Sequence, residues 1–185
     1  MTAAETFFWL SLAILFYCYS GYGILVYAWN HFRRMFSPQK IVVNYEMPAV
    51  TLVVAAYNEE AILEQKIKNS LELDYPGHLL KVIFVTDGST DLSNELISEY
   101  DSIMLLHQPE RKGKSAAIKR AMRFVETPVV IFSDANSMLN PASIKNIVRH
   151  YADENVGGVA GEKKILSGQP HSVVVTSAND RPAGS

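Results

Sequence analysis

The longest uncharged interval of the sequence lies near its N-terminus. No Asp, Glu, Lys or Arg occurs between Glu5 and Arg33, and the stretch Phe7–Trp29 reads FFWLSLAILFYCYSGYGILVYAW. As a helix it would be about 34 Å long, enough to cross a hydrocarbon core of about 30 Å. A cleaved signal peptide is disfavoured, because no basic residue precedes the stretch and it is too long for one. We therefore predict a transmembrane anchor within residues 1–32.

Charges on the two sides of this segment predict its orientation. Arg33, Arg34 and Lys40 follow it closely, whereas Glu5 is the charged side chain that precedes it. Basic residues are enriched on the cytoplasmic side of membrane helices. We expect a single-pass protein of the inner or plasma membrane, with the rest of the chain in the cytoplasm.

The remainder of the chain has the composition of one polar domain. All 17 basic residues and all acidic residues except Glu5 lie at or beyond Arg33, and the net charge of −2 indicates no nucleic-acid partner. A single cysteine, Cys18, excludes an intrachain disulfide framework. We predict a linker over residues 33–48, a domain over 49–166 and a disordered polar tail over 167–185.

Apolar runs alternate with helical patterns in this domain. Because the runs are continuous and rich in β-branched residues, they are typical of strands buried on both faces of a parallel sheet. Strong strand predictions cover Val50–Ala56, Lys81–Thr86 and Val129–Ser133, and weaker ones cover Ile103–Leu106 and Val156–Ala160. The alternation predicts an α/β fold with a mostly parallel sheet.

The helices are expected between these runs. Predicted helices cover Glu59–Glu72 with Asn58 as N-cap, Asp91–Tyr100, Ser115–Val125, and a segment from Asn140-Pro141 to about Tyr151.

Polar residues follow three of the predicted strands. They are Tyr57-Asn58-Glu59, Asp87-Gly88-Ser89-Thr90-Asp91 and Asp134-Ala135-Asn136. In open α/β sheets ligands bind beyond the carboxyl ends of the strands, so these clusters are expected to converge on one edge. Turn and cap roles would also suit these residue types. As ligands, Asp134 and Asn136 would offer two oxygens to Mg²⁺ or Mn²⁺, with Asn136 weaker than a second carboxylate.

A basic stretch begins with Arg111-Lys112-Gly113-Lys114-Ser115. Backbone N–H groups at a helix N-terminus, with lysine nearby, suit a diphosphate. A P-loop is excluded because Gln108 stands where its first glycine would be. A solvated helix face remains the alternative.

Four ordered motifs resemble those of the family-2 glycosyltransferases. They are Val53–Glu60 (VVAAYNEE), Asp87–Asp91 (DGSTD), Arg111–Ala117 (RKGKSAA) and Phe132–Asn136 (FSDAN). The resemblance runs from about Pro48 to Gly161 and implies a Rossmann-like, nucleotide-diphospho-sugar transferase half-domain. Membrane-attached relatives of this kind synthesise polysaccharides.

The resemblance also implies roles for individual residues. Tyr57 and Glu59 would lie beside the base and ribose of a nucleotide-diphosphate sugar, and Asp87 would bind the base, typically uracil. Lys114 would face the base or the diphosphate. Asp134 and Asn136 would occupy the D-x-D site, which holds the sugar-diphosphate and a divalent cation, Mg²⁺ or Mn²⁺.

The second half of the family pattern is not recognisable in the sequence. The family places its general base, and in processive members a Q-x-x-R-W motif, beyond the D-x-D half. After Gly161 the acidic residues here are Glu162 and Asp180. We therefore expect the donor-binding half of an inverting glycosyltransferase, working with another membrane subunit or the missing half. A catalytically silent fragment that binds a nucleotide sugar or a partner is the alternative.

Overall fold

A computed structural model describes residues 2–36, 46–165 and 173–176 of the chain. The chain divides into two compact units, Met1–Ile41 and Val42–Ser185, and each is described by itself.

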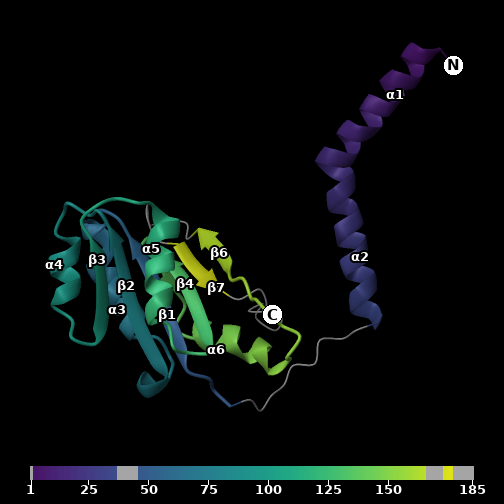
Figure 1. Cartoon of the computed structure of the whole chain (residues 1–185). Helices are drawn as coiled ribbons and strands as arrows, with labels where there is room; N and C mark the ends of the chain where they lie inside the picture. Colours follow the sequence, from purple (N-terminus) through teal and green to yellow (C-terminus); the bar gives the residue numbers. More distant parts are fainter. Residues whose placement is uncertain (1, 37–45, 166–172, 177–185) are drawn as a thin grey trace. The chain divides into compact units, whose positions relative to one another are not determined.

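The N-terminal unit is one interrupted helix. Helix α1 (Ala3–Phe16) passes through a π-helical turn (Tyr17–Gly21) into α2 (Tyr22–Phe36), as Figure 1 shows. Its start carries a reciprocal capping box between Thr2 and Glu5. The span Ala3–Arg33 is long and apolar enough to cross a membrane, and its large apolar side chains are exposed.

The second unit is built on a parallel sheet in the order β3-β2-β1-β4. Its strands are β1 (Val50–Ala56), β2 (Leu80–Asp87), β3 (Ile103–Gln108) and β4 (Val129–Asp134). All three pairings are parallel. The four strands match four of the predicted runs, so the predicted α/β fold with a mostly parallel sheet is confirmed.

Helices cover both faces of this sheet (Figure 1). One face of β1, with Leu52 and Val54, packs against α3 (Glu60–Leu71), α4 (Ser93–Ser98) and α6 (Ser143–Val148). The other face, with Val53, packs against α5 (Lys114–Ala121). Because both faces are covered, strand residues of either parity are buried, which explains the continuous apolar runs.

A second, small sheet has the order β5-β7-β6. Strand β5 (Ser137–Leu139) pairs parallel with β7 (Val173–Thr176), which pairs antiparallel with β6 (Glu162–Ile165). The predicted strand Val156–Ala160 is wrong, since this segment is irregular and precedes β6. Strand β7 lies in the tail that was expected to be disordered, and the other tail residues, 167–172 and 177–185, lie outside the described residues.

The predicted N-cap of α3, Asn58, is also wrong. Helix α3 begins at Glu60 without a side-chain cap from its own N-cap residue, Glu59. The Glu60 N–H instead donates to Asp91 Oδ2 at 3.1 Å, so a residue from the loop after β2 takes the capping role. Helix α6 begins at Ser143, later than predicted, because Asn140 closes a turn by accepting from the Ala142 N–H.

Candidate functional site

The carboxyl ends of β1, β2 and β4 lie at one edge of the sheet. In the strand register Ala56 is opposite Thr86, and Ala55 is opposite Asp134. The loops that follow therefore emerge side by side, which confirms that the three polar clusters converge.

The loops after β1 and β2 are tied to each other by hydrogen bonds. Asn58 adopts a left-handed φ of 51°, a conformation that asparagine tolerates better than most residues. Its N–H donates to Ser89 Oγ at 3.3 Å, and its Oδ1 accepts from the Thr90 N–H at 2.9 Å. The Leu92 N–H donates to Glu60 Oε2 at 3.0 Å. Of the roles that remained open in the sequence, Asn58 and Ser89 thus hold the two turns together, and Asp91 caps α3.

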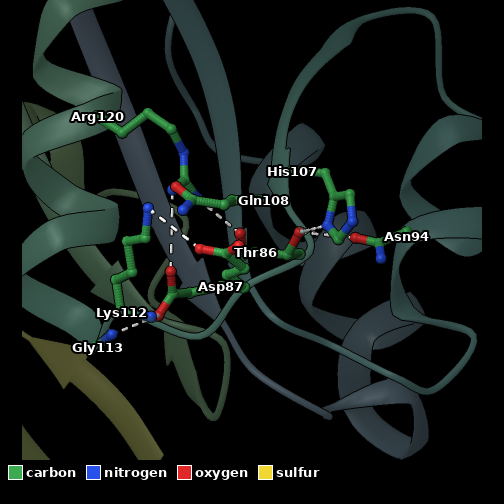
Figure 2. Close-up of polar contacts among 9 residues, drawn as sticks. Thr86, Asp87, Asn94, His107, Gln108, Lys112, Gly113 and Arg120 are labelled. Atoms are coloured by element: carbon green, nitrogen blue, oxygen red, sulfur yellow. Dashed lines mark hydrogen bonds and ion pairs between the residues drawn. The ribbon is translucent and has the colours of Figure 1, made fainter.

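Asp87 lies at the end of β2 and is almost fully buried. Its Oδ2 accepts from the backbone N–H groups of Lys112 and Gly113, at 2.8 and 2.5 Å, and this fixes the basic loop before α5 (Figure 2). Its Oδ1 lies 3.8 Å from Arg120 Nη1 and has no hydrogen-bond partner among the described residues. A buried carboxylate oxygen with an open acceptor position is costly unless a ligand donates to it.

Arg120 connects Asp87 to the neighbouring strand. Its guanidinium donates to the Thr86 carbonyl at 2.7 Å and to Gln108 Oε1 (Figure 2). The sequence placed Arg120 only in a basic stretch, and Gln108 entered only as the residue that excludes a P-loop. Arg120 lies beside Asp87, and Gln108 holds Arg120 in place. The basic stretch is therefore more than a solvated helix face.

Gly88 permits the close approach of the basic loop. Its φ is +73°, and a Cβ at this position would lie 2.9 Å from Arg111 Cβ. The Arg111 guanidinium stacks over the Tyr57 ring at 3.9 Å from the ring centroid. Arg111 was missing from the predicted site residues, although it lies in the RKGKS motif.

Lys114 and Asp134 form an ion pair between the start of α5 and the end of β4. Both side chains are partly exposed, so the pair is accessible to a ligand. The exposed Asn136 accepts a hydrogen bond from Ser137 Oγ at 3.3 Å. Next to the ion pair lies a hollow of about 460 Å³, whose apolar lining includes Phe132 and Ile118.

Glu59 lies near two other carboxylates. Burial raises the pKa of Glu59, and the nearby carboxylates of Asp91 and Asp134 raise it further. Tyr57 and Glu59 follow β1, between the ends of β2 and β4, so the predicted site residues lie along one edge.

The donor set suits a divalent cation that is shared with a ligand. Within the described ranges no three His, Cys, Asp or Glu side chains gather closely enough to hold a metal ion by themselves. Mg²⁺ is typically held by one or two carboxylates together with substrate phosphates and water. The Asp134 carboxylate already pairs with a cationic group, the Lys114 ammonium. Asp134 and Asn136 therefore fit a cation that also binds a diphosphate.

Comparison with known proteins places these motifs in a family. The sequence model described as Glycosyl transferase family 2 matches residues 51–172. A beta-monoglucosyldiacylglycerol synthase of Nostoc sp. is 30% identical over 127 residues, which cover 65% of this chain and 27% of that protein. A poly-beta-1,6-N-acetyl-D-glucosamine synthase of Staphylococcus aureus is 26% identical over 124 residues, covering 65% and 30%. The chain thus spans about a quarter to a third of the length of these relatives.

Solved structures agree with the fold. A mannosyltransferase of Pyrobaculum calidifontis, in complex with GDP-Man and Mn²⁺, superposes with a TM-score of 0.67 at 30% identity, over 76% of this chain and 43% of that one. S. aureus TarS in complex with UDP-GlcNAc gives a TM-score of 0.58 at 20% identity, over 65% and 36%, and supports the fold alone.

Proposed function

Because this chain belongs to glycosyl transferase family 2, we propose that it forms the donor-binding part of a membrane-anchored glycosyltransferase. The donor would be a nucleotide-diphosphate sugar, with UDP-sugar as the first choice, and the acceptor a glycan or lipid. The names of two similar proteins support a lipid or a glycan as the acceptor: one is a glucosyldiacylglycerol synthase and the other a poly-N-acetylglucosamine synthase.

The observation that carries the proposal is the open acceptor on Asp87. Within the part of the chain that the structure describes, its buried Oδ1 lacks a hydrogen-bond partner, while its Oδ2 holds the loop that leads to Lys114. An N–H group of a nucleobase would satisfy Oδ1, and Tyr57, beneath Arg111, would offer a ring beside the base. Glu59 would bind the ribose.

The diphosphate would lie toward the Lys114–Asp134 pair. Lys114 would turn its ammonium from Asp134 to the phosphate oxygens, and Asp134 with Asn136 would hold Mg²⁺ or Mn²⁺. When bound, the cation would neutralise charge on the nucleoside diphosphate as it leaves. In the inverting reaction, the acceptor hydroxyl attacks the anomeric carbon from the face opposite the diphosphate while a base removes its proton.

The apolar N-terminal helix supports membrane attachment. Its span Ala3–Arg33 is long enough to cross the bilayer, and the basic residues that follow favour a cytoplasmic site. We propose residues 1–32 as the anchor, 33–48 as a linker and 49–166 as the donor-binding domain. Another membrane subunit, or the second half of the fold, would complete the enzyme.

A nucleotide-sugar-binding role without turnover is the second candidate. It is favoured by the position of Asp87 and Asp134, which are engaged with the basic loop and with Lys114 and do not resemble an acceptor base. Both candidates require donor binding, and only the first requires transfer from a labelled UDP-sugar.

Calorimetry on the full chain in detergent, with Mn²⁺, tests donor binding. We expect UDP to bind, and Asp87→Ala to weaken binding at least about tenfold because a buried hydrogen bond to a charged acceptor contributes about 1.5–3 kcal/mol. The control is Asp101→Ala, which changes an exposed aspartate before β3 and should leave the affinity unchanged. Absence of binding to both UDP and GDP, or an unaltered affinity in Asp87→Ala, would overturn the proposal.

A further inference from the structure

Helix α3 carries a lysine whose side chain is fully buried. Lys66 has no exposed surface, and its ammonium donates to Ser133 Oγ at 2.8 Å and to the Ser137 carbonyl. Lys68, two residues further along, is exposed and pairs with Glu64. The two lysines look alike in the sequence but have opposite environments.

The two acceptors of Lys66 stand on either side of the turn that carries Asp134 and Asn136. Ser133 is in the last part of β4, and Ser137 begins β5. Ser133 Oγ also lies 3.4 Å from the Ser137 carbonyl. The Lys66 ammonium therefore links the two ends of the turn through one hydrogen bond to each end.

A second side chain of the same helix holds the far end of β5. Asn69 donates from Nδ2 to the Leu139 carbonyl and accepts from the Leu139 N–H at Oδ1, both at 2.8 Å. Lys66 and Asn69 are three residues apart, so they project from one face of α3. On the other side of the turn, the Ala135 N–H donates to the Ala55 carbonyl of β1 at 3.1 Å.

Burying an ammonium group costs free energy, because the group loses its hydration. Within the described part of the chain, no carboxylate lies within ion-pair distance of Lys66. Burying an ammonium without a carboxylate partner has a desolvation cost, which hydrogen bonds to two neutral acceptors offset only in part. The contacts of Lys66 are thus better explained by the position that they give to the turn than by stability.

We propose that Lys66, assisted by Asn69, is a positioning residue that holds the turn Asp134-Ala135-Asn136 in the geometry needed for the donor diphosphate and its cation. This inference rests on the proposed function for its ligand. The placement of the turn by α3 is a separate claim, and it can be measured without any ligand.

The test compares Lys66→Met, Asn69→Ala and the control Lys68→Met in the full chain in detergent. The first readout is amide hydrogen exchange in peptides covering residues 133–139, with β2 as internal reference. We expect Lys66→Met to accelerate exchange in the turn about tenfold relative to β2, Asn69→Ala to do so to a smaller extent, and Lys68→Met to change neither.

The second readout is the ratio of UDP affinities with and without Mn²⁺. In Lys66→Met this ratio should fall about tenfold, while the affinity for UDP alone stays as in the wild type because Asp87 and Tyr57 are untouched. A purely structural role would instead change both affinities together.

Three outcomes would overturn the inference. Unchanged exchange in the turn, equal acceleration over the turn and β2, or an unchanged affinity ratio in a protein that binds UDP would overturn it. If Lys66→Met fails to fold, Asn69→Ala decides by the same criteria. If the wild type binds neither UDP nor Mn²⁺, the proposed function fails, and the exchange data still show whether Lys66 holds the turn.

Discussion

Single residues at this site hold a loop in place with some of their polar atoms and keep others available to a ligand. Asp87 fixes the loop before α5 with one carboxylate oxygen, and the other oxygen receives no hydrogen bond from any described residue. At the other end of the site, Lys114 forms an ion pair with Asp134. A ligand that binds between them would donate to the open oxygen of Asp87, leave the contacts of its other oxygen in place, and replace the contact between Lys114 and Asp134.

The pH dependence of stability should reveal the buried Lys66. Burial lowers the pKa of Lys66 to about 8 from 10.5, and the Asp134 carboxylate opposes the change. Between these values the unfolded chain binds more protons than the folded one, so the free energy of unfolding should rise with pH from about 8 to about 10.5. The full effect would be roughly 3 kcal/mol.

Urea unfolding at pH 7.5 and pH 10 measures this rise. We expect the rise in the free energy of unfolding to be lost in Lys66→Met. It should persist in Lys68→Met, because the ammonium that this change removes is exposed. Because the two variants differ only at positions 66 and 68, the contributions of all other groups are the same in both. The same slope in Lys66→Met and Lys68→Met would contradict the assignment.

Gly88 should tolerate no side chain. An alanine there would adopt an unfavourable φ of +73° and bring its Cβ to 2.9 Å from the Arg111 backbone nitrogen. We expect Gly88→Ala to lower the free energy of unfolding by about 2 kcal/mol or more, as measured by denaturant unfolding.

Gly77→Ala provides the comparison for this substitution. A Cβ at Gly77 would meet no atom within 4 Å, so the change should stay below about 1 kcal/mol in either direction. Equal losses in the two variants would show that the approach of Arg111 to Gly88 is unimportant.

At the scale of elements, strands were more predictable than the ends of helices. Val50–Ala56 matched β1 because a strand covered on both faces must be apolar at every position. The start of α3 was mispredicted because its cap comes from Asp91, a residue 31 positions away. Strand β5 has only three residues, Ser137–Leu139, and it depends on a partner strand and on Asn69. Such short elements leave no periodicity in a sequence.

The proposed membrane helix can be tested with the single cysteine of the chain. Cys18 lies exposed on the π-helical turn, midway along the apolar span. If the span crosses the bilayer, a charged, membrane-impermeant maleimide should not label Cys18 in sealed vesicles but should label it after SDS is added.

A cysteine in the polar domain serves as the reference for labelling. Glu95→Cys, on the exposed side of α4, should react in inside-out vesicles without detergent and stay unlabelled in right-side-out vesicles. Labelling of Cys18 at the same rate as Glu95→Cys would contradict a membrane-spanning helix.

At the scale of the whole molecule, the sequence predicted an anchor and a donor-binding domain, but it did not reveal every residue of the site. The apolar segment and the four motifs pointed to an anchor and a donor-binding fold. Lys66 could not be found in this way, because a lysine in an amphipathic helix usually lies at the surface. Its burial follows from the packing of α3 under the turn after β4, a contact between segments that are remote in the sequence.

This remoteness has a consequence for the order in which the protein is made. The acceptors of Lys66 follow it by 67 and 71 residues, so at about 5–20 residues per second the ribosome needs several seconds to supply them. During that time the ammonium stays hydrated, and β1 can pair with β2 but lacks β4 on its other side. The edge that carries Asp134 is therefore the last part of the main sheet to assemble on the nascent chain.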